Sequence, residues 1–135
     1  SHGDAMKIAD HQRKQAQMKA SEVMDLFKVR AQDTNFLTEA TEQLLANRKV
    51  LRWSYVYGFY LNKGDSQERQ LFEYLQEDLE KHTDKLSHLY EQPLEKINDY
   101  HEFMKYKEEV TNYTRVTAGF LKKFVEGVMG GLTDV

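Results

Sequence analysis

The stretch from residue 48 to residue 61 constrains the fold more than any other part of the chain. It contains the only Trp, and from Val50 onward every residue except Arg52, Ser54 and Gly58 is hydrophobic. These three exceptions fall on no single face of a helix. A segment that is apolar on nearly all sides belongs in the middle of a fold.

Two kinds of secondary structure fit this stretch. Its aromatic residues alternate as they would along a pleated strand. The apolar residues before them repeat at helical spacing, however, and no second alternating run exists that could pair with a strand. We therefore expect a helix, which begins near Phe36 and ends near Leu61. The helically spaced positions are Leu37, Ala40, Leu44 and Leu51.

The rest of the chain also predicts helices. Residues 7–30 are rich in Lys, Gln, Ala, Glu and Met and contain no helix breaker. A turn at residues 62–66 precedes a third helical stripe, which should end near Glu91 because Pro93 lacks a backbone donor. A looser stripe runs from Leu94 to the glycines at residues 130 and 131. The pattern predicts an all-α fold, an antiparallel bundle of three to four long helices.

Residues 1–6 read as an expression-vector remnant, and residues 7–135 as one helical domain. The core of that domain should be built on the second and third helices. We expect Trp53→Ala to cost about 3–5 kcal/mol of stability through lost burial. The predicted core scaffold is Leu44, Leu51, Trp53, Tyr55, Phe59, Phe72, Leu75 and Leu79.

Composition excludes several kinds of function. The chain has no Cys, which rules out disulfides, Cys-bound zinc, iron–sulfur clusters and a thiol nucleophile. With 19 basic and 22 acidic residues it carries a net charge of −3 and no basic stripe for nucleic acid. It also lacks a hydrophobic signal region and an apolar run of the ~20 residues that span a membrane. We expect a cytoplasmic or nuclear location and no membrane partner.

No constellation of side chains predicts chemistry in this chain. No His follows a Glu by three residues, so the di-iron signature of helical bundles is absent, and His82 is expected to be a core or boundary residue. The acidic residues around Glu77 and Asp78 lie opposite the buried stripe and should be exposed. The glycosylation sequon at Asn112 falls inside a helix and reads as chance. We expect no catalytic residue, no metal and no cofactor.

The second and third helices resemble a known family. The pattern Phe36-Leu37-x-x-Ala40 to Leu44, then Arg48 and Leu51-x-x-x-Tyr55-Val56-x-x-Phe59-Tyr60-Leu61, resembles the central helix of the Ariadne domain. This domain is the C-terminal helical region of Ariadne-type RING-between-RING (RBR) ubiquitin ligases. The similarity continues through Phe72-Glu73 and Asp78-Leu79-Glu80 to Glu91. Asn47 stands where family members often have Cys.

The resemblance implies a regulatory function. In such ligases the Ariadne domain covers the catalytic cysteine of the second RING domain, and binding of a neddylated cullin–RING ligase relieves the inhibition. An acid at the end of the third helix takes part, and Glu91 matches it. The family's Phe-Glu pair in the first helix aligns with Ala9 and Asp10, so the acid is kept as Asp10 but the Phe is missing. Zinc is expected only in the RING domains of the parent ligase.

The absence of Cys agrees with this interpretation independently, because a chain without Cys cannot form a ubiquitin thioester. The fragment is therefore expected to regulate a ubiquitin-protein transferase and not to be its catalytic part. The alternative is a free-standing interaction module, a helical bundle whose groove binds a partner helix or peptide.

Overall fold

The fold consists of four long helices and two short 3₁₀ turns. The structure, a computed structural model, describes residues 2–61 and 66–130, apart from the side chains of residues 2, 59–61 and 129. No strand occurs within these ranges, so the predicted all-α class is confirmed. The elements are α1 (His2–Phe27), η1 (Ala31–Thr34), α2 (Asn35–Leu61), α3 (Ser66–Tyr90), η2 (Leu94–Lys96) and α4 (Tyr100–Met129).

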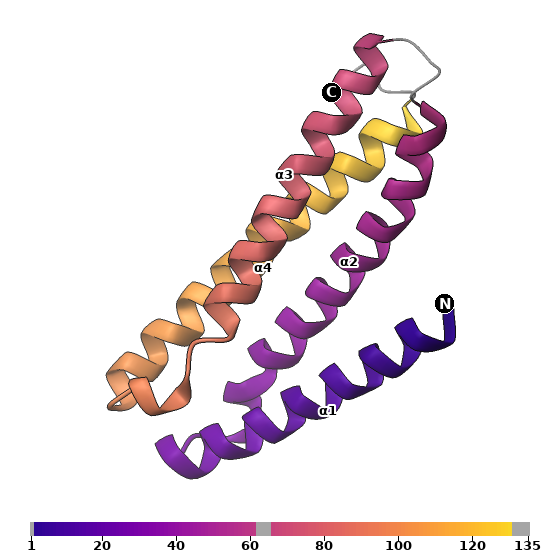
Figure 1. Cartoon of the computed structure of the whole chain (residues 1–135). Helices are drawn as coiled ribbons and strands as arrows, with labels where there is room; N and C mark the ends of the chain where they lie inside the picture. The colour runs from indigo at the N-terminus through magenta and orange to yellow at the C-terminus, as the bar shows by residue number, and fades with distance from the viewer. Residues whose placement is uncertain (1, 62–65, 131–135) are drawn as a thin grey trace.

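The helices α2, α3 and α4 lie side by side along the long axis of the molecule, whereas α1 crosses only the lower part of α2 (Figure 1). The most extensive helix contacts join α3 to α4 and α2 to α3. The helices α1 and α2 lie close together at the C-terminal end of α1 and move apart towards its N-terminus (Figure 1). Residues 2–6 lie within the helical range of α1.

The helix ends follow from local chemistry. The helix α1 ends at Phe27, earlier than expected, because Lys28 adopts a left-handed backbone conformation with φ of 57°. The chain leaves α3 one residue before Glu91, as the Pro93 argument predicts. The fourth helix starts later than expected, at Tyr100, where Asp99 Oδ1 accepts a 2.9 Å hydrogen bond from the Glu102 backbone N–H.

The core consists of two clusters, one at each end of the bundle. The lower cluster surrounds Phe103, and the upper cluster surrounds Phe72 and Phe124. Of the predicted core scaffold, five residues are buried and Phe59 lies outside the described side chains. The buried five are Leu44, Leu51, Phe72, Leu75 and Leu79.

The prediction that Trp53 and Tyr55 belong to the core is wrong. Their side chains are 49% and 54% exposed, because this part of α2 turns its small residues towards α3 and α4. Ser54 is fully buried, and a Cβ on Gly58 would lie 3.1 Å from the Phe72 ring. The interior side of α2 is thus kept narrow enough for Phe72 to pack against it, and Trp53 and Tyr55 lie outside.

A buried polar network joins α2, α3 and α4. Asn47 is fully buried, and its Nδ2 donates to Thr83 Oγ1 at 3.0 Å and to Thr117 Oγ1 at 2.9 Å. Its Oδ1 accepts from Gln43 Nε2 at 2.8 Å. Such a network stabilises a fold only when each buried donor and acceptor in it has a hydrogen-bond partner. Here the side-chain amide of one residue fixes the register of three helices.

Candidate functional site

One hollow of the described surface is a groove between the N-terminal half of α1 and the middle of α2. It has a volume of about 550 Å³. Ala5 and Ala9 from α1 and Leu45 and Ala46 from α2 give it an apolar lining. The groove exists because α1 diverges from α2 and carries alanines where a packed helix pair would carry larger side chains. We call it the α1–α2 groove.

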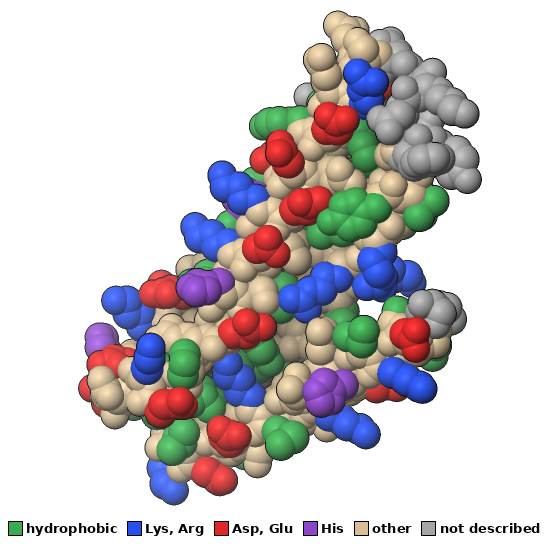
Figure 2. Space-filling model, in the orientation of Figure 1, with side chains coloured by type: hydrophobic (Ala, Val, Ile, Leu, Met, Phe, Trp, Pro, Cys, Tyr) green, Lys and Arg blue, Asp and Glu red, His purple; other side chains and the backbone are tan. Residues whose placement is uncertain are grey.

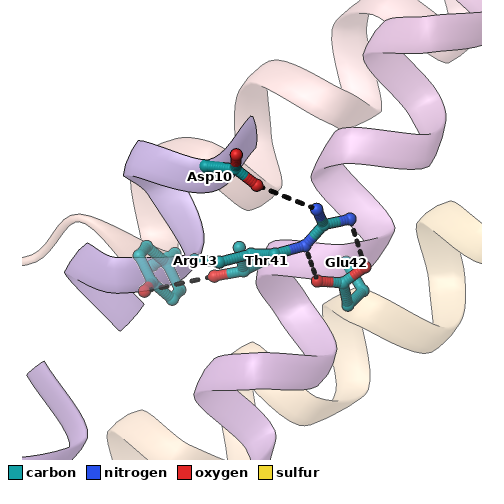
Figure 3. A network of polar contacts seen from close by, with 5 residues as sticks. Asp10, Arg13, Thr41 and Glu42 are labelled. Carbon is teal, nitrogen blue, oxygen red and sulfur yellow. Dashed lines mark hydrogen bonds and ion pairs between the residues drawn. The ribbon is translucent and has the colours of Figure 1, made fainter. Parts of the chain in front are cut away.

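One ion pair bridges this groove. Arg13 Nε and Nη2 donate to the two carboxylate oxygens of Glu42 at 2.8 and 3.1 Å, in a bidentate arrangement (Figure 3). The hydrogen bond with Glu42 raises the pKa of Arg13, and the same bond lowers the pKa of the Glu42 carboxyl. Both side chains are about half exposed, so the pair orients the helices more than it stabilises them.

Asp10 lies at the edge of the same groove. Its Oδ1 is 3.9 Å from Arg13 Nη1, a long contact, and 72% of the side chain is exposed (Figure 3). The neighbouring Ala9 lines the groove. The carboxylate of Asp10 is therefore accessible to another molecule, and the small side chain of Ala9 leaves room beside it.

The α2 side of the groove is basic. Arg48, Lys49 and Arg52 line it, and Figure 2 shows basic side chains gathered over α2 just above α1. Among the described residues, neither Lys49 nor Arg52 has a carboxylate within ion-pair distance. The same face of α2 continues past the groove through Trp53 and Val56, which are 49% and 60% exposed. A partner in the groove would thus meet basic and aromatic side chains together.

Glu91 follows α3 directly and connects to α1 through a chain of polar contacts. Ser87 Oγ donates to Glu91 Oε1 at 3.3 Å, and Arg48 Nη2 donates to Ser87 Oγ at 3.2 Å. Arg48 Nη1 reaches Gln12 Oε1 at 3.5 Å. Gln12 and Arg48 line the groove and also a second hollow of about 80 Å³, which Glu91 borders. Asp10 and Glu91 therefore lie beside two hollows that share a wall.

The end of α3 also contacts α1. Lys19 Nζ donates to the Tyr90 carbonyl and lies 4.5 Å from the centre of the Tyr90 ring. Tyr106 Oη donates to the same carbonyl at 2.6 Å, and Thr41 Oγ1 lies 3.3 Å from Tyr90 Oη. Tyr90 thus contacts the three other helices. A cation at a helix C-terminus also interacts favourably with the helix dipole.

Lys19 is unusual because it is a partly buried lysine. Burial lowers its pKa to about 8, although Glu91 and Glu22 act in the opposite direction. The sequence does not predict this role of Lys19, and it does not predict that Arg48 connects Gln12 of α1 to Ser87 of α3. The available signal was that Lys19 lies between Ala16 and Val23 at helical spacing, on the buried side of α1.

The predictions for His82 and for metals concern the middle of the bundle. His82 is half-buried, stacks on Phe120 with ring centres 3.8 Å apart, and shares a hydrogen bond with Tyr113 Oη through Nδ1. Burial lowers its pKa. It is thus the boundary histidine that the sequence predicts.

Within residues 2–61 and 66–130, no three His, Cys, Asp or Glu side chains converge as metal ligands would. None of the helices there combines the length and apolarity needed to cross a bilayer.

The four-helix fold, with one helix partly detached, can be compared with known proteins. The Ariadne domain model matches residues 1–133, and this chain belongs to that family, the Ariadne domains of RBR E3 ubiquitin ligases. It is 63% identical over 134 residues to rbrA of Dictyostelium discoideum, named a probable E3 ubiquitin-protein ligase. That alignment covers 99% of this chain and 26% of rbrA.

More distant relatives occur in Arabidopsis thaliana. The probable E3 ubiquitin-protein ligases ARI7 and ARI10 are 32% and 33% identical, over 74% and 76% of this chain and 18% and 21% of their own lengths. The chain thus spans about a quarter or less of the curated relatives it matches. No solved structure matches it significantly.

Proposed function

We propose that this domain holds its parent RBR ligase inactive by docking against the second RING domain, where it covers the catalytic cysteine. One observation carries the proposal. The two acids that the family resemblance assigns to the clamp, Asp10 and Glu91, border hollows that share the walls made by Gln12 and Arg48. A single partner surface can therefore contact both acids at once.

The character of the groove supports a protein partner. It combines an apolar lining with accessible charged groups of both signs at its edge, as interfaces with an apolar centre and a polar rim do. The Asp10 carboxylate is left largely free by its long contact to Arg13. Contacts made by solvent-exposed charges are weak, and they favour a reversible clamp that an activator can open.

Release of the clamp by a neddylated cullin–RING ligase is part of the same proposal. It rests on the family resemblance, and the parent would then act as a ubiquitin-protein transferase. The alternative is an interaction module that binds an unrelated helix in the α1–α2 groove. The exposed Trp53 and Val56 beyond the groove favour it, because aromatic anchors of this kind dominate many interfaces.

The test uses the fragment in trans. Added to a parent ligase that lacks this region, the chain should suppress autoubiquitylation. The double variant Asp10→Ala, Glu91→Ala should inhibit roughly tenfold less well, because each substitution removes a charged contact at the interface. Glu73→Ala is the matched control, since Glu73 is an exposed acid near the opposite end of α3.

Two results would decide against autoinhibition. One is a ligase that stays fully active at saturating fragment. The other is a double variant that inhibits as well as Glu73→Ala does. Tight binding of the fragment to a helix from an unrelated protein, competed by neither RING domain nor parent ligase, would support the interaction module instead.

A further inference from the structure

A second large hollow lies at the C-terminal end of α1, whereas the α1–α2 groove borders its N-terminal half. It has a volume of about 620 Å³ and is formed where the end of α1, the turn η2 and the start of α4 meet. None of the residues assigned to the autoinhibitory clamp lines it. We call it the end pocket, and its floor consists of Phe27, Leu94 and Ile97.

The floor and walls of the end pocket are held in place by the fold. Leu94 and Ile97 are buried, and the Phe27 ring stacks on Phe103 with centres 5.0 Å apart. The left-handed conformation of Lys28 directs the chain away at one side. At the other side Asn98 and Asp99 are fixed by Glu102, which accepts from the Asn98 backbone N–H at 3.0 Å. The pocket is therefore preformed, a property that lowers the entropic cost of binding.

Two large side chains flank this pocket without being covered. Leu26 is 58% exposed and Tyr100 is 57% exposed. Exposed single hydrophobic residues are common, but here both line one concave site with an apolar floor. Apolar clefts that carry a few convergent polar groups are the usual form of a binding site.

The charge at the pocket entrance is mainly acidic. Glu22, Glu95 and Asp99 line it, against the single cation of Lys28. Asp99 is occupied as the cap of α4. Neither Glu22 nor Glu95 has a basic group within ion-pair distance among the described residues. Acidic and hydrophobic side chains lie interleaved at this lower end of the molecule (Figure 2).

We propose that the end pocket binds a basic segment of a partner protein. The segment inserts one large apolar side chain between Leu26 and Tyr100 and places Lys or Arg side chains against Glu22 and Glu95. The charge selects this occupant, because an acidic segment would be repelled at the entrance. The site differs from the α1–α2 groove, whose α2 wall is basic and favours a partner of the opposite sign. The inference does not depend on the autoinhibitory function.

A peptide selection tests the proposal. Random short peptides displayed on phage are selected against the intact chain, and the enriched sequences are synthesised for affinity measurement. We expect enrichment of an apolar residue flanked by Lys or Arg. Two double variants should each lower the affinity about tenfold or more. One is Glu22→Lys with Glu95→Lys, and the other is Leu26→Ala with Tyr100→Ala. Raising NaCl from about 0.05 to about 0.5 M should weaken binding as well.

The matched control for the charge reversal is the double variant Glu108→Lys with Glu109→Lys. It changes the net charge by the same amount as the end-pocket variant, at two exposed positions of α4. Circular dichroism and the unfolding midpoint verify that each variant folds. The proposal is overturned if no peptide is enriched, if the enriched peptides are acidic, or if they bind the end-pocket variants unchanged. Self-association that Leu26→Ala abolishes would identify a second copy as the occupant and would likewise overturn it.

Discussion

The two sides of α2 are built in different ways. Towards α3 and α4 it presents buried leucines together with small and polar residues that are fully enclosed, with Asn47 and Ser54 both hydrogen-bonded. Towards α1 it presents alanine, basic residues and exposed aromatics around an open groove. The large hydrophobic side chains of α2 thus lie on its exposed face as well as in the core. If the groove has the function that we propose, stability and recognition are separated on opposite sides of one helix.

The largest effect should come from breaking the enclosed side. Asn47→Ala removes the amide that joins three helices and leaves Thr83 and Thr117 without their shared donor. Because buried polar groups that lose their partners keep the desolvation cost, we expect the free energy of unfolding to fall by about 2–4 kcal/mol. Urea unfolding followed by circular dichroism measures this loss.

Gln43→Ala is the matched control for that experiment. It removes only one partner of the Asn47 carbonyl and lies in a partly exposed position. We expect it to cost less than half as much. Equal losses in the two variants would mean that the interhelical bonds to α3 and α4 carry no particular weight.

A smaller effect should come from the contact that attaches α1. The pKa of Lys19 is lowered to about 8 in the folded chain from an ordinary value of 10.5. Between these two pH values the unfolded chain binds more protons than the folded chain, so stability should rise as the pH rises from about 8. Since water still reaches part of Lys19, we expect an increase in Tm on the order of 2–4 °C by about pH 9.5.

Lys19→Met separates this contribution from the others, because it keeps the length of the side chain and cannot titrate. The variant should show no rise in Tm between pH 8 and pH 9.5. The window stops there because burial raises the pKa values of Tyr90 and Tyr106. Above the ordinary tyrosine pKa of about 10 the unfolded chain loses those protons first, so stability falls again. A rise that persists in Lys19→Met would assign the effect to another group.

The smallest effect on stability should come from the open side. Trp53 stacks on Tyr57 with ring centres 5.0 Å apart but remains half exposed. We therefore expect Trp53→Ala to cost about 1 kcal/mol or less, in place of the 3–5 kcal/mol that the sequence predicts for a buried residue. Thermal unfolding of the variant measures it. A loss comparable to that of Asn47→Ala would contradict the separation of the two sides of α2.

Much of the fold could be predicted from the sequence, because helical periodicity and Pro93 are local signals. The turn expected at residues 62–66 falls almost entirely outside the described residues. The orientation of α2 could not be predicted. Its second half is apolar on nearly all sides, so the periodicity that normally identifies the buried face is lost between Val50 and Leu61. The decisive residues were Ser54 and Gly58, whose small size permits close packing but carries no hydrophobic signal.

The candidate site shows a similar division. Glu91 and Asp10 are assigned to the site by resemblance to a family, and this assignment stays a prediction. Arg48 and Lys19, which connect the helices around them, were not found, because long basic side chains on helices are usually solvated. Their importance depends on contacts between residues far apart in the sequence, Lys19 with Tyr90 and Arg48 with Ser87, that no local pattern encodes.

The attachment of α1 at Lys19 has a mechanical consequence. The part of α1 from Lys19 to Asp4 is about 22 Å long at ~1.5 Å per residue, and its N-terminal half borders the groove. Pivoting this part by about 10° about Lys19 would displace Asp4 by roughly 4 Å, which is about the width of a side chain. A small rotation of α1 about Lys19 would therefore change the width of the groove, and it would have to stretch or break the Arg13–Glu42 ion pair that spans it.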